Sequence, residues 1–336
     1  MNIDRYHDAM DHVSFDPALE DRVLSRVEEA RAQPRRARCA PSRRRTLAVA
    51  LAAALCLVAT AGAVGRLSGL FAPRFGSHPE IVEQSGREVS ACAASAGYTL
   101  TADALFGDQN CLYVAMTLTR EDGGLIDSDG LFLHLEEVSL PGFRGGGYGA
   151  QVRPGQGKTD SVSLSASIVS YEKIAQGETL TLSFDRLARV DESPDAEPLA
   201  EGDWTLSFPV NCGDLTRSVA LDAPIPVGDT GFTFDTLCLS PLSVWAVGSG
   251  VPGSDQELGQ VLETLSGYDF SLILKDGTVI DLLQVDGDFR SRSVSHEGGG
   301  RYGMKLSTVF PDLIPLEDMA SLTLCGQSIP LDLSGT

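Results

Sequence analysis

Hydrophobic and polar side chains alternate along most of the chain after residue 76, and such alternation is typical of strands with one buried face. The clearest case is SVSLSASIVS at 161–170, in which four apolar side chains, beginning with Val162, alternate with serines. Glycine, proline and aspartate separate the alternating stretches, which favours antiparallel sheets that cover a core with one face. The strands that this pattern predicts in the first half are 97–106, 112–119, 161–170, 179–184 and 203–210.

A second series of strands follows residue 216 and repeats features of the first. GFTFDTLCLSPLSVWAV at 231–247 has the same order as GYTLTADALFGDQNCLYVAM at 97–116: glycine, aromatic residue, threonine, apolar strand, turn and a further strand. The stretch 318–333 is similar to the closing strands of the first half. The predicted fold class is therefore mainly β, with two antiparallel, immunoglobulin-like β-sandwich domains in series, at 77–213 and 216–336.

Two local signals modify the second series. In DQELGQVLETL at 255–265, the apolar residues recur at helical spacing, and we expect a short helix that covers an open sheet edge. Asp276-Gly277 lies between two apolar runs and predicts a tight turn between strands.

The stretch from Thr46 to Val64 contains nineteen uncharged residues in a row. As a helix it reaches about 28 Å, close to the ~30 Å hydrocarbon thickness of a bilayer. It has no polar face, unlike the core helix of a soluble domain, and forty-five residues precede it, unlike a secretory signal. We therefore predict a transmembrane helix at 46–65. A cleaved signal, with Ala61-Gly62-Ala63 at the cleavage site, and a buried core helix are the alternatives.

Charge sets the expected orientation of the span. Seven arginines and no acidic residue lie between Arg31 and Arg45, whereas few basic residues follow the span closely. By the positive-inside rule the N-terminus is cytoplasmic, with Arg43, Arg44 and Arg45 as topogenic residues, and the C-terminal domains are extracellular. The chain as a whole has a net charge of −20, and its acidic outer part argues against binding to nucleic acid.

Residues 1–45 form the predicted cytoplasmic segment, with two short amphipathic helices ahead of the arginine-rich stretch. Asp16 and Pro17 are suited to the start of the second helix. About thirty residues cannot build a core of their own. Because each apolar side chain gains roughly 1.5–3 kcal/mol on burial, we expect both apolar stripes to be buried against a partner protein. The predicted partner-binding residues are Ile3, Tyr6, Met10, Val13, Phe15, Leu19, Val23, Leu24 and Val27. A weak helical hairpin, or a segment resting on anionic lipid, is the alternative.

The sequence contains no catalytic or cofactor-binding motif that we can identify. The five histidines are scattered, and His134 lies in an alternating apolar stretch where it is expected to be a strand-face residue. The acidic loop 121–130 misses the spacing of a calcium-binding loop, and we expect a solvated loop rather than a metal site. We predict a protein that is not an enzyme and uses no cofactor or metal.

Five cysteines lie in the predicted outer part, at positions 92, 111, 212, 238 and 325. No two have the C-x-x-C spacing of a zinc or redox motif. The odd number leaves at least one without an intramolecular disulfide partner. The others are either small buried residues or members of one or two disulfides.

The order of these parts resembles a known family. YHDAMDHVSFDPALEDRVLSRV, RRR with an alanine-rich span, GAVGRLSGLF and TADALFGDQNCLYVAMTLT together resemble the membrane-anchored family of Gram-positive bacteria catalogued as domain of unknown function 4179. The last third, with LKDGTVIDL and LIPLEDMASLTLCGQSIPLDL, is similar to the immunoglobulin-like domain that often follows it.

The resemblance implies an anti-sigma-factor-like role. In that role the cytoplasmic helices bind an extracytoplasmic-function sigma factor, and the residues that match the family pattern are Tyr6, Met10, Phe15, Leu19, Leu24 and Val27. The outer domains would sense the envelope through an unknown extracellular ligand. The alternative function is a cell-surface adhesion or envelope-binding protein that has no sigma-factor partner.

Overall fold

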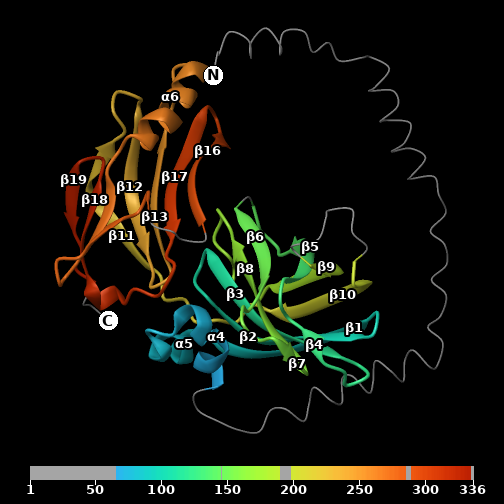
Figure 1. Ribbon diagram of the computed structural model, residues 1–336. Coiled ribbons are helices and arrows are strands. Elements are labelled where there is room, and N and C mark those ends of the chain that lie inside the picture. The colour runs from blue at the N-terminus through green and yellow to red at the C-terminus, as the bar shows by residue number, and fades with distance from the viewer. Residues whose placement is uncertain (1–65, 145, 190–197, 285–288, 334–336) are drawn as a thin grey trace, which may run out of the picture. The chain divides into compact units, whose positions relative to one another are not determined.

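The computed structural model describes residues 66–144, 146–189, 198–284 and 289–333, which all belong to one compact unit, residues 49–336. These residues form a mainly β structure with few helices, as the alternation predicts (Figure 1). No helix within these ranges is both long and apolar enough to cross a bilayer. The predicted span at 46–65 lies outside the described residues.

Two short helices, α4 (Arg66–Phe75) and α5 (Pro79–Ser85), precede the first strand and lie beside β2 (Figure 1). Pro79 is the first residue of α5, where a residue without an N–H loses no hydrogen bond. Gly86 follows α5, and its N–H donates to the carbonyl of Val82 at 2.7 Å. The alternation predicts a β domain from residue 77, whereas the structure is helical up to residue 85 and its first strand begins at Arg87.

The first sandwich, residues 87–209, consists of a five-stranded and a three-stranded sheet with antiparallel pairing. The larger sheet has the order β1 (Arg87–Ser95), β2 (Tyr98–Gly107), β3 (Cys111–Arg120), β8 (Ser161–Val169), β6 (Gly147–Val152). The smaller sheet has the order β10 (Ala200–Pro209), β9 (Thr179–Arg189), β5 (Leu131–Ser139). The short strands β4 (Ile126–Asp127) and β7 (Lys158–Thr159) pair with each other.

The core of the first sandwich lies between the faces that the alternation predicts. In β8, Val162, Leu164 and Ala166 are buried in this core, and the serines between them are less buried. Trp204 of β10 is fully buried, and its ring N–H donates to the carbonyl of Tyr98 at 3.1 Å. Burial of a tryptophan requires such a hydrogen bond for its single polar atom.

The second sandwich, residues 217–330, also pairs its strands antiparallel in two sheets. The five-stranded sheet has the order β11 (Arg217–Pro226), β12 (Phe232–Leu239), β13 (Ser243–Gly250), β17 (Arg301–Val309), β16 (Phe289–Gly298). The four-stranded sheet has the order β15 (Val279–Asp281), β14 (Phe270–Leu274), β18 (Met319–Leu324), β19 (Gln327–Pro330), and a 3-10 turn, η1 (Leu316–Asp318), precedes β18.

Both local signals in this half are confirmed. The predicted helix at 255–265 is α6 (Asp255–Ser266), which buries Val261 and Leu265 in the core of the second sandwich and contacts the edge strand β16. The Asp276-Gly277 turn joins β14 to β15, and Gly277 has φ of +88°, a conformation that favours glycine.

The two sandwiches repeat one topology. In each five-stranded sheet, three consecutive strands are followed by two later strands in reverse chain order, so that β1-β2-β3-β8-β6 corresponds to β11-β12-β13-β17-β16. The irregularities correspond as well: pairing shifts at Asp103 between β2 and β3, and at Asp235 between β12 and β13. Each of these aspartates lies five residues before the turn that joins its two strands. The repeat in the sequence is thus present in the order and the irregularities of the strands.

Candidate functional site

The residues predicted from the sequence to bind a partner lie outside the described residues, and so do the topogenic arginines. These residues are Ile3, Tyr6, Met10, Val13, Phe15, Leu19, Val23, Leu24, Val27, Arg43, Arg44 and Arg45. A candidate site within the described part of the chain must therefore come from the two sandwiches and from α4 and α5.

Two of the four acidic side chains of the loop 121–130 pair with arginines. Asp122 forms a 2.5 Å ion pair with Arg120, and Asp127 lies 3.7 Å from Arg189. Residues 66–144, 146–189, 198–284 and 289–333 contain no group of three or more histidine, cysteine, aspartate or glutamate side chains that could hold a metal ion. This loop therefore offers no cluster of oxygen ligands to a hard cation such as calcium.

His134 lies on β5 as the strand pattern predicts, with its Nδ1 atom 2.6 Å from Oδ1 of Asp185 on β9. Both side chains are about two-fifths exposed, at 39% and 43%. Exposed pairs of this kind contribute little to stability because water screens them.

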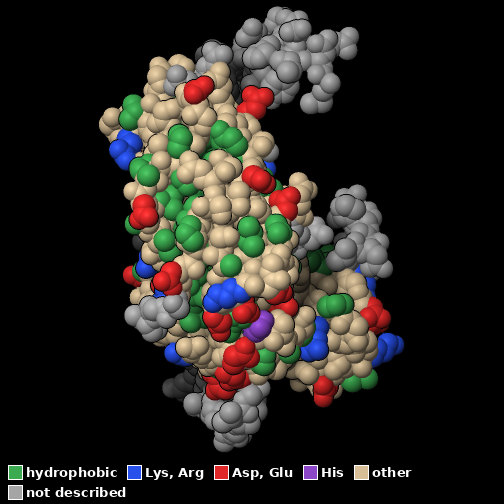
Figure 2. All heavy atoms as spheres, turned by 90° about the vertical axis from the view of Figure 1, so that its left-hand side faces the viewer, with side chains coloured by type: hydrophobic (Ala, Val, Ile, Leu, Met, Phe, Trp, Pro, Cys, Tyr) green, Lys and Arg blue, Asp and Glu red, His purple; other side chains and the backbone are tan. Residues whose placement is uncertain are grey.

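Surface hydrophobic residues give no single patch. The large apolar side chains exposed in the described residues are Leu125, Tyr148, Leu199, Val251, Leu262 and Val279, which come from different loops, strands and helices. Figure 2 shows one face of the molecule, on which hydrophobic side chains lie among polar ones. Scattered apolar residues are normal on a soluble surface and do not identify a binding site.

The most unusual chemistry lies in the turn that joins β2 to β3, at Asp108, Gln109 and Asn110. All three polar side chains are buried, which is rare for a hairpin turn. Oδ1 of Asp108 accepts hydrogen bonds from the backbone N–H groups of Asn110 at 2.8 Å and Cys111 at 2.7 Å. Aspartate favours turns because its side chain can accept such bonds locally. Gly107 is required before this turn, because a Cβ atom there would lie 2.2 Å from the carbonyl oxygen of Cys111.

The corresponding turn of the second sandwich, between β12 and β13, has the same arrangement with a serine. Oγ of Ser240 accepts hydrogen bonds from the backbone N–H groups of Leu242 at 3.1 Å and Ser243 at 3.0 Å. Ser240 therefore occupies the place of Asp108 in the repeat, and Ser243 the place of Cys111.

These two turns meet, and we call their contact the junction. Oδ2 of Asp108 accepts hydrogen bonds from the hydroxyls of Ser240 and of Ser243, the second at 2.8 Å. Oγ of Ser243 in turn accepts the ring N–H of Trp245 at 3.0 Å. Asp108 and Ser240 are each 1% exposed and Ser243 is 2% exposed. The carboxylate thus has four donors, which is what a buried acidic group needs to be tolerated.

Burial changes the acidity of this carboxyl group. Removal from water is the largest influence and raises the pKa of Asp108 above its ordinary value of 3.8. The hydrogen bonds from Ser240, Asn110, Ser243 and Cys111 lower the pKa and offset part of that effect.

Backbone hydrogen bonds attach both turns to their own sandwiches in the same way. The carbonyls of Asn110 and Gln109 accept from the N–H groups of Ser170 and Ile174. In the second sandwich, the carbonyls of Leu242 and Pro241 accept from Phe310 and Ile314, which hold the corresponding positions. The side chain of Asn110 also donates to the carbonyl of Ser170 at 3.0 Å. A movement of either turn therefore requires a movement of the strands beside it.

An apolar cluster surrounds the polar contact and includes residues from both sandwiches and from the two helices. Its buried members are Phe71, Phe75, Val82, Ala104, Phe106, Cys111, Tyr113, Ala115, Val169, Leu242, Trp245, Val309 and Leu313. Phe75 packs edge-on against Phe106 and Tyr113, with ring centroids 5.4 and 5.0 Å apart. Such a cluster excludes water and so strengthens the hydrogen bonds of the junction.

Polar contacts at the rim connect the sandwiches further. The hydroxyl groups of Tyr171 and Ser291 lie 2.7 Å apart. Nζ of Lys305 donates to the carbonyl of Tyr171 at 2.5 Å and lies 3.2 Å from a carboxylate oxygen of Glu172. These half-exposed contacts bridge the first sandwich to β16 and β17.

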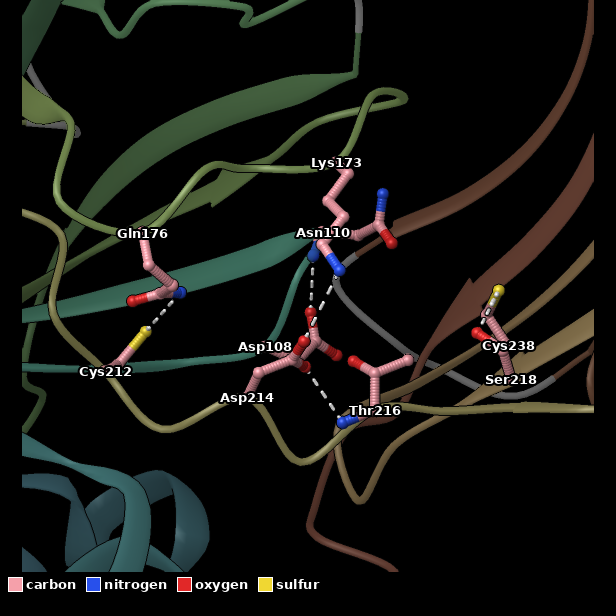
Figure 3. A network of polar contacts seen from close by, with 9 residues as sticks. All are labelled: Asp108, Asn110, Lys173, Gln176, Cys212, Asp214, Thr216, Ser218 and Cys238. Carbon is pink, nitrogen blue, oxygen red and sulfur yellow. Dashed lines mark hydrogen bonds and ion pairs between the residues drawn. The ribbon is translucent and has the colours of Figure 1, made fainter.

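The segment between the sandwiches contains Cys212, whose Sγ atom lies 3.8 Å from the side-chain amide of Gln176 (Figure 3). Burial raises the pKa of the Cys212 thiol to about 11, and the nearby Asp108 carboxyl contributes to the rise. Asp214, two residues further on, pairs with Lys173 at 3.7 Å. Because the thiolate is the reactive form of cysteine, Cys212 is a buried structural residue rather than a nucleophile.

The hydrogen bonds and the apolar cluster of the junction are together suited to hold the two sandwiches in contact. Among the cysteines of the predicted outer part, Cys212, Cys238 and Cys325 are free thiols. No residue of the junction stands out in the sequence, since aspartate and serine in hairpin turns are common at the surface. The available signal was the repeat itself, which places GDQNC and LSPLS at the same position in two copies of one hairpin.

Comparisons with known proteins add little to this picture. No protein-family model and no curated protein matches the sequence. A search of solved structures matches the conserved domain protein from Bacillus anthracis, which is 12% identical over 70% of this chain and 75% of that chain, with a TM-score of 0.41. A similarity of this size supports no inference about function, and the family resemblance of the sequence stays a prediction.

Proposed function

We propose that this chain is a single-pass membrane regulator of the anti-sigma-factor type. In this proposal residues 1–45 are cytoplasmic and bind an extracytoplasmic-function sigma factor through the two apolar stripes. Residues 46–65 cross the membrane, and the two sandwiches are extracellular immunoglobulin-like domains that respond to a condition of the envelope. The protein is not an enzyme and uses no cofactor.

One observation carries the proposal: α4 (Arg66–Phe75) follows the predicted span directly in the sequence, and together with α5 it is part of the apolar cluster at the junction. Phe71 and Phe75 are buried there, with Val82 of α5. A domain that served only for attachment would need no such contact, because a flexible linker is sufficient to display an adhesive surface. A sensor needs one, since a change outside must reach the span.

The test uses the full chain in its membrane, with an affinity tag at the C-terminus. Capture after detergent extraction should recover a sigma factor, identified by mass spectrometry. Leu24→Asp places a charge in the second apolar stripe and should abolish the capture, because burial of an unpaired carboxylate is strongly unfavourable. Glu20→Gln, on the polar side of the same predicted helix, is the matched control and should retain it.

The effect of a deletion on transcription distinguishes the anti-sigma function from the alternative function. An adhesion or envelope-binding protein predicts that deletion of residues 2–30 leaves the transcriptome unchanged, while loss of the sandwiches impairs attachment or wall integrity. If the wild-type chain captures no sigma factor and this deletion has no transcriptional effect, the anti-sigma function is wrong.

A further inference from the structure

We infer that α4 and α5 form a latch that is held in place by the contact between the two sandwiches, so that opening the junction releases the segment next to the span. We call α4 and α5 together the helix pair. The contacts of the helix pair with both sides of the junction are a property of the described residues. Its use in signalling across the membrane rests on the proposed function.

The helix pair is anchored first on the first sandwich. The ring of Phe71 lies 5.7 Å from that of Phe106, and Phe75 contacts both Phe106 and Tyr113. The guanidinium group of Arg74 lies 4.9 Å from the centroid of the Tyr113 ring. Phe106 and Tyr113 pair with each other in β2 and β3, next to the Gly107–Leu112 pair that leads into the Asp108 turn. The surface on which the helix pair rests is therefore continuous with the junction.

The second sandwich completes the binding surface. Leu242 of the Ser240 turn and Leu313 belong to the same apolar cluster as Phe71, Phe75 and Val82. Ser77, between α4 and α5, donates from its hydroxyl to a carboxylate oxygen of Asp312 at 2.8 Å. If the two sandwiches separate, the helix pair loses one side of its binding surface.

The connection between the sandwiches is attached to the helix pair as well. Gly213 donates its backbone N–H to the carbonyl of Ser85, the last residue of α5, at 2.8 Å. A Cβ atom on Gly213 would lie 3.1 Å from the Cα and Cβ atoms of Ser85, which is closer than side chains normally approach. Ser85 itself is buried, and its hydroxyl donates to the carbonyl of Ile81. The helix pair therefore contacts both sandwiches and the segment that joins them.

The helices have little stability of their own. α5 has seven residues, and a helix of this length is marginal in water. Pro73 lies inside α4, where it removes a backbone hydrogen bond. The helix pair consequently depends on its tertiary contacts, and partial loss of these contacts is expected to unfold or undock it as a unit.

Hydrogen exchange on the full chain in detergent or nanodiscs, followed by mass spectrometry of peptides, tests this coupling. Ser240→Ala removes one donor to Asp108 and the acceptor of two backbone N–H groups. We expect exchange in residues 66–86 to become about tenfold faster or more, the effect of losing one hydrogen bond to a charged group. Thr230→Ala is the matched control, because it removes a buried hydroxyl hydrogen bond, to Val227, at the opposite end of β12. It should leave residues 66–86 unchanged.

A second variant opens the rim of the junction without touching the turns. Lys305→Met removes the contacts with Tyr171 and Glu172, neither of which belongs to the helix pair. It should also accelerate exchange in residues 66–86, whereas Lys275→Met, in the exposed turn after β14, should not.

Coupling free energies are reciprocal, so a variant that disturbs the helix pair should also affect the junction. Gly213→Val should displace Ser85 and accelerate exchange in the helix pair, and it should also loosen residues 240–243. Gly69→Ala is the control for added volume, since nothing lies within 4 Å of a Cβ atom at that position of α4. Because alanine favours a helix more than glycine does, this variant should not accelerate exchange in the helix pair and should leave residues 240–243 unchanged.

Three results would overturn the latch. One is faster exchange confined to the two turns, with residues 66–86 unchanged in Ser240→Ala and Lys305→Met. Another is uniform acceleration across both sandwiches, which would mean that the junction is no separate element. The third is a change in the controls equal to that in the variants. Loss of the latch with sigma-factor capture intact would leave the proposed function standing, and an intact latch without capture would refute only the proposed function.

Discussion

Asp108 and Ser240 occupy the same place in two copies of one hairpin, and they hydrogen-bond to each other. Each side chain also accepts two backbone N–H groups of its own turn. The duplicated fold thus joins its copies through corresponding residues, one of which is an acid and the other an alcohol. The difference matters chemically, because a hydroxyl can donate to the carboxylate, whereas two carboxylates would repel each other at this distance.

The effect of replacing Asp108 on stability should depend on which hydrogen bonds the new side chain can accept. Asp108→Ala leaves two backbone N–H groups and two hydroxyls without their acceptor, and we expect a loss of about 2–4 kcal/mol in the free energy of unfolding. Asp108→Asn keeps Oδ1 for the backbone N–H groups but places an amide donor opposite Ser240, whose Oγ already accepts two N–H groups, and Ser243, whose Oγ already accepts one. Its loss should therefore be smaller than that of the alanine variant.

Urea denaturation of the full chain in detergent measures this difference. The chain has two tryptophans, Trp204 in the first sandwich and Trp245 at the junction, so its own fluorescence reports on both regions without further substitution. Equal losses for the alanine and asparagine variants would show that the four donors do not hold the carboxylate as described.

The raised pKa of Asp108 predicts the sign of a pH effect. Because the folded state holds the proton more tightly than the unfolded state, the free energy of unfolding falls as pH rises between the two pKa values. The contribution is greatest below the ordinary pKa of 3.8, where both states are protonated, and its loss is complete above the raised pKa of the folded state.

Other carboxylates also titrate in this range, so the contribution of Asp108 is measured as the difference in the free energy of unfolding between the wild type and Asp108→Asn. The stability of the wild type relative to Asp108→Asn should decline as the pH rises above the ordinary pKa of 3.8, because the asparagine variant lacks this titration. A difference that stays constant over this range would contradict the raised pKa.

Much of the fold follows from the sequence because strands with one buried face have a period of two. The serine-rich strand at 161–170, the helix at 255–265 and the turn at Asp276-Gly277 all appear as expected. The helices within residues 66–85 are not predicted, since RLSGLFAPRFGSHPEIVEQS contains glycines and prolines that disfavour a helix, and tertiary contacts of Phe71 and Phe75 override that preference.

The junction could not be predicted because its defining property is burial. Asp108 lies in a turn, and nothing local distinguishes a turn that faces water from one that faces a second domain. Only the meeting of two distant hairpins, 132 residues apart at Asp108 and Ser240, makes the carboxyl group unusual. The predicted partner-binding residues before the span lie outside the described residues and stay predictions.

Gly107 provides a test of the turn geometry that is independent of charge. A methyl group at this position would lie 2.2 Å from the carbonyl oxygen of Cys111 and 2.8 Å from a methyl carbon of Leu112, so the backbone must shift. Gly107→Ala should therefore lower the free energy of unfolding by about 2 kcal/mol or more, as overpacking does in a dense interior. In Gly149→Ala, the control in strand β6, the methyl group meets nothing within 4 Å, and stability should be unchanged or slightly higher. Equal effects in both variants would show that the Asp108 turn is less tightly packed than described.

Thiol labelling reports on the segment between the sandwiches. With a pKa of about 11, the Cys212 thiol is ionised about 100-fold less at pH 8 than a cysteine with the ordinary value of 9.0. Cys325, whose pKa burial also raises to about 11, should behave in the same way. Alkylation with iodoacetamide, followed by peptide mass spectrometry, should modify both thiols at least about 100-fold more slowly in the folded chain than in urea.

Asp108→Ala should accelerate labelling of Cys212, because the junction is part of what keeps this thiol from water. The same variant should leave the labelling rate of Cys325, in the second sandwich, unchanged. Rapid labelling of Cys212 in the folded wild type would show that this segment opens without any disturbance of the junction.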